Sequence, residues 1–215
     1  LTDEHDEVNT GSSAHTITAN GNAATSTTKS KFYGTSLYFD GSGDNLTIPA
    51  SSDFDFGTGA YTIEMWLRTT LDSGWLWYDA DGDTGMRMCV GNNGSNSSNA
   101  GKIEFNEQVS NGDVYTQGTS RVDDGNWHHL AVCRGASGGT RLYVDGILEA
   151  TGNSGRNFDN NNTVYIGQRS SGSGTDFNGY IQDIRVYKGV AKYTSAFIVP
   201  TRQTNAADID LLADV

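Results

Sequence analysis

The densest group of residues that could do chemistry is the acidic stretch DADGD at residues 79–83. Asp79, Asp81 and Asp83 alternate around Gly82, and carboxylate oxygens at this density suit a hard cation such as calcium. The stretch lacks the twelve-position spacing and the terminal Glu of an EF-hand loop, and acidic hairpin tips are common. The three aspartates are therefore candidate calcium ligands, with a solvated turn as the alternative interpretation.

Aromatic residues precede this acidic stretch. Trp75, Trp77 and Tyr78 could place flat rings against the apolar face of a pyranose, with Asn, Asp and Gly groups nearby to bond its hydroxyls. Regular alternation predicts that Trp75 and Trp77 share one face of a strand, although a Trp in a β-sandwich is often a core residue. Asn93 and Tyr115, on neighbouring segments, complete the predicted carbohydrate-contact set.

The carboxylates elsewhere do not form a catalytic pair. A retaining glycosidase needs two carboxyl groups about 5 to 5.5 Å apart. The closest pairing is Glu104 and Glu107, whose odd spacing places them on opposite faces of a strand. Glu64 has no partner acid, and we expect it to form a surface ion pair with Arg68. The sequence therefore predicts a protein that is not an enzyme.

The charge balance restricts the possible partners. The 215 residues include 26 acidic and 14 basic side chains, which gives a formal net charge of −12. A polyanion would be repelled, so we expect no nucleic-acid partner. No apolar run approaches the roughly 20 residues of a membrane span, so we expect no membrane insertion. The acidity suits divalent cations or neutral polyols, but surface carboxylates also serve solubility alone.

Short alternating segments must position these residues. In the segment YTIEMWLR, Ile63, Met65 and Leu67 alternate with polar or aromatic residues, as in a strand with one buried face. The 27 glycines against 2 prolines fit frequent tight turns between strands. We predict one all-β domain over residues 1–200 and a C-terminal tail over residues 201–215.

Several segments, in a characteristic order, resemble one known family. They are SLYFDGSGDNLTIP (36–49), GNWHHLAVCR (125–134), RLYVDGIL (141–148), VYIGQRS (164–170) and FNGYIQDIRVYKGVAKYT (177–194). From about Thr16 to Pro200 the chain resembles the laminin G-like jelly roll of the concanavalin A-like lectin/glucanase superfamily, of the type found in phage structural proteins and bacterial surface proteins. The resemblance implies an all-β, jelly-roll β-sandwich of two antiparallel sheets.

The resemblance also implies a structural calcium ion (Ca2+). In sandwiches of this superfamily the ion commonly uses the acid of the final strand's motif, which Asp183 matches here, and lectin-like relatives use loop acids of the kind found at residues 79–83. The alternative for Asp183 is a buried carboxylate satisfied by turn amides. The laminarinase and lichenase glycosidases of this fold carry a motif resembling Glu-x-Asp-x-x-Glu, which this sequence lacks. A β-glucan hydrolase is therefore the less favoured interpretation.

The expected function is a noncatalytic, carbohydrate-binding recognition or adhesion module on a phage particle (virion) or bacterial cell surface. Its expected partners are a glycan or other virion or surface protein subunits, and it could form a homo-oligomer. The alternative is a purely structural virion protein, such as a capsid decoration or tail-fibre component, that binds protein subunits. Cys89 and Cys133 lie on two predicted strands, and the sequence leaves their redox state open.

Overall fold

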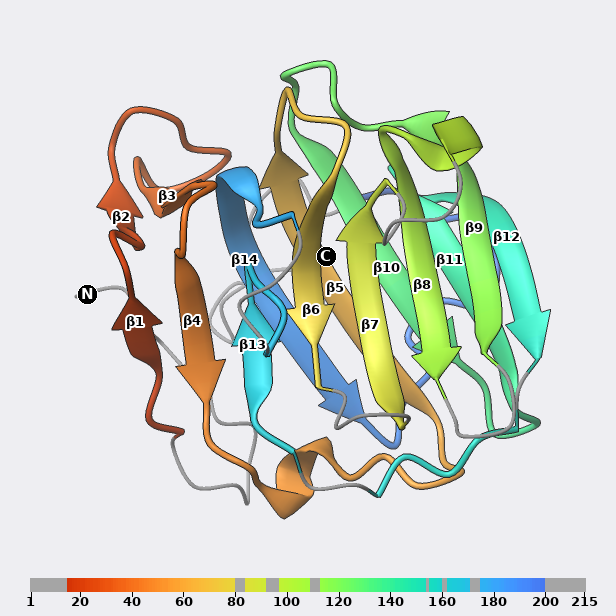
Figure 1. Ribbon diagram of the computed structural model, residues 1–215. Coiled ribbons are helices and arrows are strands. Elements are labelled where there is room, and N and C mark those ends of the chain that lie inside the picture. The colour runs from red at the N-terminus through yellow and green to blue at the C-terminus, as the bar shows by residue number, and fades with distance from the viewer. Residues whose placement is uncertain are drawn as a thin grey trace, which may run out of the picture.

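The computed structural model describes residues 15–79, 84–91, 97–108, 113–153, 155–159, 162–170 and 175–199. Two seven-stranded sheets pack face to face (Figure 1). Neighbouring strands pair antiparallel within each sheet. The predicted all-β sandwich of two antiparallel sheets is confirmed. The predicted tail at residues 201–215 lies outside the described residues.

The sheet nearer the viewer in Figure 1 is called sheet A. Its strands, in sheet order, are β1 (Thr18–Asn20), β4 (Asn45–Ile48), β13 (Val164–Ile166), β6 (Gly74–Tyr78), β7 (Gly85–Val90), β8 (Lys102–Gln108) and β9 (Val114–Arg121). Sheet B contains β12 (Ile147–Asn153), β11 (Gly139–Val144), β10 (His128–Arg134), β5 (Tyr61–Arg68), β14 (Asn178–Lys188), β3 (Ser36–Asp40) and β2 (Ala24–Ser26). Two short 3₁₀ turns are η1 (Ser52–Phe54) and η2 (Ser97–Asn99).

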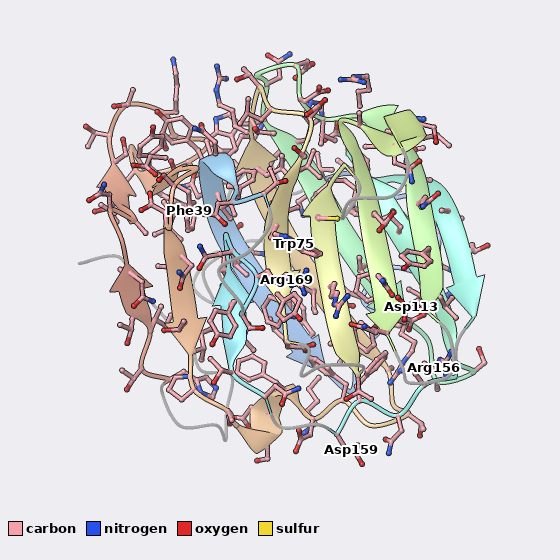
Figure 2. The ribbon with its side chains drawn as sticks, in the orientation of Figure 1. Phe39, Trp75, Asp113, Arg156, Asp159 and Arg169 are labelled. Atoms are coloured by element: carbon pink, nitrogen blue, oxygen red, sulfur yellow. The ribbon has the colours of Figure 1, made fainter. Side chains whose placement is uncertain are left out.

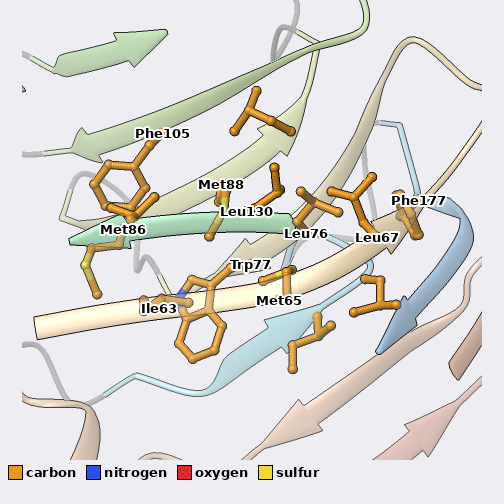
Figure 3. Close-up of a cluster of buried hydrophobic side chains, with 14 of the residues drawn as sticks. Ile63, Met65, Leu67, Leu76, Trp77, Met86, Met88, Phe105, Leu130 and Phe177 are labelled. Atoms are coloured by element: carbon orange, nitrogen blue, oxygen red, sulfur yellow. The ribbon is translucent and has the colours of Figure 1, made fainter. Parts of the chain in front are cut away.

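The core lies between the sheets, where alternate residues of each strand meet (Figure 3). On β5 the predicted inward residues Ile63, Met65 and Leu67 are fully buried, as sequence alternation required. Met88 of β7 and Phe105 of β8 cover them from sheet A. The outward-facing residues of β6 to β9 point away from sheet B and are not part of this core.

A buried guanidinium ties the loops together at one end of the sandwich. The Arg134 side chain donates hydrogen bonds to the carbonyl oxygens of Gly57 (2.6 Å), Gly59 (2.7 and 2.9 Å) and Arg156 (2.7 Å). It also lies 4.8 Å from the ring centroid of Tyr61. Carbonyl oxygens replace the water that this cation gives up, so Arg134 has a structural role.

The outer face of sheet B is covered by residues 189–199, which fold back over β5 and β10. Lys192 Nζ lies 2.6 Å from Glu64 Oε1, and the Tyr193 hydroxyl donates to Glu64 Oε2 at 2.7 Å. Only 1% of the Glu64 side chain is exposed. The expected surface ion pair of Glu64 with Arg68 is therefore wrong, because a segment distant in sequence buries Glu64 and supplies its cation.

Among the described residues, no helix has the length and apolarity that crossing a membrane requires.

Candidate functional site

A β-bulge in β6 separates the two tryptophans that we expected on one face. Trp75 lies opposite Cys89 of β7, whereas Trp77 lies opposite Met88, so Leu76 and Trp77 share one partner. Trp77 consequently enters the core, where it is 1% exposed (Figure 3). The prediction of a shared face was wrong, and Trp77 is removed from the carbohydrate-contact set.

Five side chains lie directly opposite one another across the outer face of sheet A, the face turned away from sheet B. This group, the tyrosine row, consists of Tyr165, Tyr78, Arg87, Asn106 and Tyr115 from β13, β6, β7, β8 and β9. The Arg87 guanidinium lies 5.1 Å from the ring centroid of Tyr78. The row therefore combines aromatic rings with hydrogen-bonding groups over five strands. Tyr115 is exposed and Tyr165 half-buried, whereas Tyr78, Arg87 and Asn106 are buried.

A second set of opposed residues, the tryptophan row, runs beside the first. It consists of Trp75, Cys89, Glu104 and Gln117 from β6, β7, β8 and β9. Trp75 meets Tyr78 of the tyrosine row edge to face, with ring centroids 5.7 Å apart. The predicted residues Trp75, Tyr78 and Tyr115 are thus brought onto one face, where Trp75 (4% exposed) and Tyr78 (3% exposed) are buried and Tyr115 is exposed. Asn93 lies outside the described residues.

Polar contacts fix the β8 and β9 end of this face. Asp113 accepts hydrogen bonds from the Tyr115 hydroxyl (2.8 Å) and from Asn106 Nδ2 (3.2 Å). Tyr115 remains 47% exposed, whereas Asn106 is 2% exposed. Burial, together with the hydrogen bond to Asp113, raises the pKa of Tyr115. The phenol stays neutral near pH 7 and offers a ring that is accessible to a ligand.

The carboxylate of Glu104 is only half satisfied. Its Oε2 atom accepts from Gln117 Nε2 at 2.8 Å and from Asn99 Nδ2 at 3.4 Å. Its Oε1 atom is buried and has no donor among the described residues. Burial raises the pKa of Glu104 although these two amides oppose the shift. A ligand group that donates a hydrogen bond would remove this deficit.

Glu104 does not combine with Glu107 to form a catalytic pair. Glu107 points into the sandwich, where it accepts a hydrogen bond from Thr140 Oγ1 of β11 at 3.1 Å. Glu104 points to the opposite side of β8, as predicted from their odd spacing. The two carboxyl groups therefore cannot act together on one glycosidic bond.

Of the acidic stretch predicted to bind calcium, only Asp79 is among the described residues; Asp81 and Asp83 lie outside them. Asp79 is 6% exposed, and its Oδ1 atom accepts from the Met86 backbone N–H at 2.6 Å. Burial raises the pKa of Asp79 to about 6, even though the Met86 hydrogen bond favours the charged form. Asp79 thus acts as a structural acceptor beside β7.

Asp183, the other predicted calcium ligand, sits in a β-bulge of β14. Gln182 pairs with Trp66 and Arg185 with Glu64, so Asp183 and Ile184 together oppose one residue of β5. Asp183 has a φ of +57°, which Asp tolerates better than most residues. Its carboxylate oxygens each accept from Arg185 at 2.8 Å. A guanidinium thus occupies the position where the prediction required a cation.

The described residues contain no cluster of metal-binding side chains. No group of three or more His, Cys, Asp or Glu side chains in the described ranges is arranged to hold a metal ion. Asp183 pairs with Arg185 and Asp79 accepts from Met86, and calcium binding by either residue stays a prediction from the sequence. Calcium binding that involves Asp81 and Asp83 stays a prediction from the sequence.

Sequence reasoning missed most of the outer face of sheet A. The alternation in KIEFNEQ indicates that Glu104, Asn106 and Gln108 lie on one side of β8, opposite Phe105, and that signal was available. Tyr165 and Arg87 join the site only through strand pairing. No local pattern in the sequence reveals that pairing.

The sequence of residues 40–193 matches the family described as the concanavalin A-like lectin/glucanases superfamily, in its laminin G-like form. The match spans well over half of the chain. The chain belongs to this superfamily. The predicted family membership is confirmed, and the outer face of sheet A is the candidate binding face of a laminin G-like domain. No curated protein matches the sequence.

Solved structures agree with the fold of this laminin G-like domain. Domain 4 of AbnA, an extracellular arabinanase from Geobacillus stearothermophilus in complex with arabinotriose, is 19% identical, with a TM-score of 0.61; the match covers 81% of this chain and 82% of that chain. The binding domain of botulinum neurotoxin DC in complex with SialylT is 11% identical, with a TM-score of 0.61 over 92% of this chain. Domains LG4-5 of the mouse laminin alpha1 chain are 18% identical, with a TM-score of 0.56 over 74% of this chain.

The chain spans less than half of the toxin and laminin chains, at 46% and 44% of their lengths. At these identities the likeness concerns the fold alone.

Proposed function

We propose that this laminin G-like domain is a noncatalytic carbohydrate-recognition module that binds glycan on the outer face of sheet A. The observation that carries the proposal is the combination of exposed Tyr115 with the half-satisfied carboxylate of Glu104 on adjacent strands. Aromatic surface beside hydrogen-bonding groups is the chemistry that sugar rings require. Three similar structures support this assignment: the arabinanase domain is in complex with arabinotriose, the botulinum neurotoxin DC domain is in complex with SialylT, and botulinum neurotoxin type C interacts with two ganglioside molecules.

We place the domain on an exposed surface, either of a phage particle or of a cell. The extracellular arabinanase and the receptor-binding toxin domains support an exterior location. The resemblance of the segments at residues 36–49 and 177–194 to phage structural and bacterial surface proteins supports the narrower placement. The separation of Glu104 from Glu107 supports a role in binding rather than hydrolysis.

Replacing the exposed aromatic residue tests the proposed binding face. Tyr115→Ala should abolish glycan binding or weaken it at least about fivefold, because a stacked ring contributes on the order of 1 kcal/mol or more. A glycan array followed by calorimetry on any hit measures the effect. Tyr33→Ala is the matched control, since Tyr33 is 56% exposed beside Phe32, which packs on sheet B. Equal binding by wild type and Tyr115→Ala would contradict the proposal.

A second candidate function is a structural particle protein that binds other protein subunits. Exposed apolar residues gather at the β11–β12 turn, where Ile147 is 62% and Leu148 41% exposed. Ile198 is 92% exposed and follows Phe197, whose backbone N–H bonds the Gly146 carbonyl in this turn. A blank glycan array together with self-association that is lost in Ile198→Asp would favour this function.

A further inference from the structure

Strand β8 carries three acceptor oxygens that lack donors. Glu104 Oε1, Asn106 Oδ1 and Gln108 Oε1 are out of contact with water and have no hydrogen-bond partner among the described residues. Glu104 and Asn106 are each 2% exposed. Leaving a buried acceptor unpaired is unfavourable, so three of them on one strand indicate a bound group that supplies donors.

The spacing of these three oxygens along β8 restricts the shape of a ligand that could donate to all of them. Glu104, Asn106 and Gln108 are alternate residues of one strand, so their side chains leave the same face about 6.8 Å apart. The set therefore extends over roughly 13 to 14 Å along β8. A compact ligand could satisfy one of the acceptors, whereas all three require an elongated ligand with donors at regular intervals.

The negative charge around these oxygens restricts the charge of the ligand. Asp113 lies within hydrogen-bond distance of Asn106, and the chain carries a net charge of −12. A carboxylate or sulfate placed here would meet acceptors and negative charge. Hydroxyl groups are neutral and can donate to each oxygen.

We propose that the site takes a linear, neutral, hydroxyl-rich oligosaccharide that lies along β8, with its rings flanked by Tyr115 of β9. This inference rests on the proposed carbohydrate-binding function and specifies the substrate class. It places successive sugar hydroxyls opposite Glu104, Asn106 and Gln108. Affinity therefore grows with the number of sugar units.

An acidic sugar is the rival ligand, and two cations favour it: Arg87, which lies opposite Asn106, and Arg169. Arg169 follows β13, and its buried Nε atom has no partner among the described residues. Figure 2 shows Arg169 over the same part of the sheet as Trp75, at the other end of the tryptophan row from Gln117. Arg169 offers one donor to an acidic group, whereas β8 offers three acceptors that would repel such a group. The neutral ligand therefore fits the site better.

Calorimetry on the full chain tests the inference, with linear oligosaccharides of arabinose and of glucose from one to four units and with sialyllactose. We expect a neutral series to bind with affinity that rises at least about tenfold from one unit to three, with little dependence on salt. Glu104→Gln, which replaces an acceptor by a donor, should weaken the trisaccharide at least about tenfold. Gln108→Leu, at the end of the strand, should weaken only the longer oligosaccharides and covers the case in which Glu104→Gln fails to fold.

The possible failures are distinguishable. Binding of sialyllactose alone, lost in Arg169→Gln, would overturn the neutral ligand and leave the carbohydrate-binding function standing. Equal affinity for one and three units, or unchanged affinity in both β8 variants, would overturn the placement along β8. Absence of binding to every glycan would overturn the proposed function and this inference together.

Discussion

Asp79 makes the protein less stable as pH rises. The pKa of Asp79 is raised from 3.8 to about 6, so the folded state keeps a proton that the unfolded state has released. The contribution of Asp79 to the free energy of unfolding is therefore greatest below pH 3.8 and falls by roughly 3 kcal/mol as pH approaches 6.

Asp79→Asn should remove this loss, because a neutral amide oxygen can still accept the Met86 N–H. We expect the variant to exceed wild type in free energy of unfolding at pH 7 by up to about 3 kcal/mol, and to match it near pH 4. Urea unfolding at the two pH values measures both differences. A variant less stable than wild type at pH 7 would contradict this prediction. It would indicate that a cation such as calcium stabilises the charged carboxylate of Asp79.

His129 has the opposite effect over an overlapping range of pH. Its ring packs against Trp66 and Phe197 on the outer face of sheet B, and its Nε2 atom lies 3.6 Å from Glu64 Oε2. Burial lowers the pKa of His129 to about 4, against the pull of Glu64. The unfolded state binds the proton first as pH falls, so stability present above pH 6.5 is lost toward pH 4, by roughly 3 kcal/mol.

His129→Phe should flatten this acid sensitivity, because it keeps an aromatic ring between Trp66 and Phe197 but cannot take up a proton. The variant should lose less of its free energy of unfolding between pH 7 and about pH 4 than wild type does. Chemical unfolding across this range, compared with Asp79→Asn, separates the two residues. If the free energy of unfolding of His129→Phe falls as steeply with decreasing pH as that of wild type, other titrating groups cause the acid sensitivity.

At the scale of elements, Glu149 joins the edge strands of the two sheets. This residue of β12 accepts hydrogen bonds from the Thr119 backbone N–H (2.7 Å), the Ser120 backbone N–H (2.9 Å) and the Ser120 hydroxyl (2.8 Å) of β9. Partial burial opposes ionisation, but these bonds lower the pKa of Glu149. The carboxylate therefore contributes stability above its unfolded-state pKa, which is lost as pH falls.

Glu149→Ala should lower the free energy of unfolding by about 1 to 2 kcal/mol at pH 7, because it leaves donors on β9 unpaired. The difference from wild type should shrink as pH falls through the lowered pKa of Glu149 and the wild-type carboxylate takes up a proton. Glu149→Gln, which keeps one acceptor, should lie between the two. Hydrogen exchange of the Thr119 and Ser120 amides would localise the change, and unaltered exchange in Glu149→Ala would contradict this role.

The bulge in β14 places the Asp183 carboxylate against Arg185. Burial raises the pKa of Asp183 although Arg185 opposes the shift, so Asp183→Asn should change the free energy of unfolding by no more than about 1 kcal/mol, equally with calcium and with chelator. Asn keeps the tolerance for positive φ, so the change isolates the charge. Thermal unfolding in the two conditions measures the cost. A loss seen only with calcium would support the ligand role that the sequence predicts for Asp183.

The two bulges also mark where sequence reasoning stopped at this scale. Alternation correctly predicted that Ile63, Met65 and Leu67 face the core, because β5 is regular. In β6 the segment WLWY is apolar throughout, so its composition does not reveal the register shift that sends Trp77 inward and leaves Trp75 outside. Prediction from the sequence was therefore accurate for the regular strands and failed at the candidate site.

At the scale of the whole molecule, the unpredicted features come from segments that meet across long sequence separations. Glu64 acquires Lys192 from the segment that covers sheet B, and Asn106 acquires Arg87 and Tyr115 through strand pairing. Recognition of the superfamily supplied the architecture, which fixes the number of sheets but not the residues that decorate their outer faces. The tyrosine row therefore arises only from the pairing of strands in the folded protein.

The two cysteines lie on opposite sides of the sandwich, and both thiols are free and buried. Cys89 belongs to the tryptophan row of sheet A, whereas Cys133 packs with Ala131 and Tyr143 on the outer face of sheet B. Burial raises the pKa of each thiol, so an alkylating reagent meets a shielded and protonated sulfur. The alkylation rate of each cysteine therefore reports how often the structure around that thiol opens locally. A glycan bound to the outer face of sheet A should slow the alkylation of Cys89 and leave the alkylation of Cys133 unchanged.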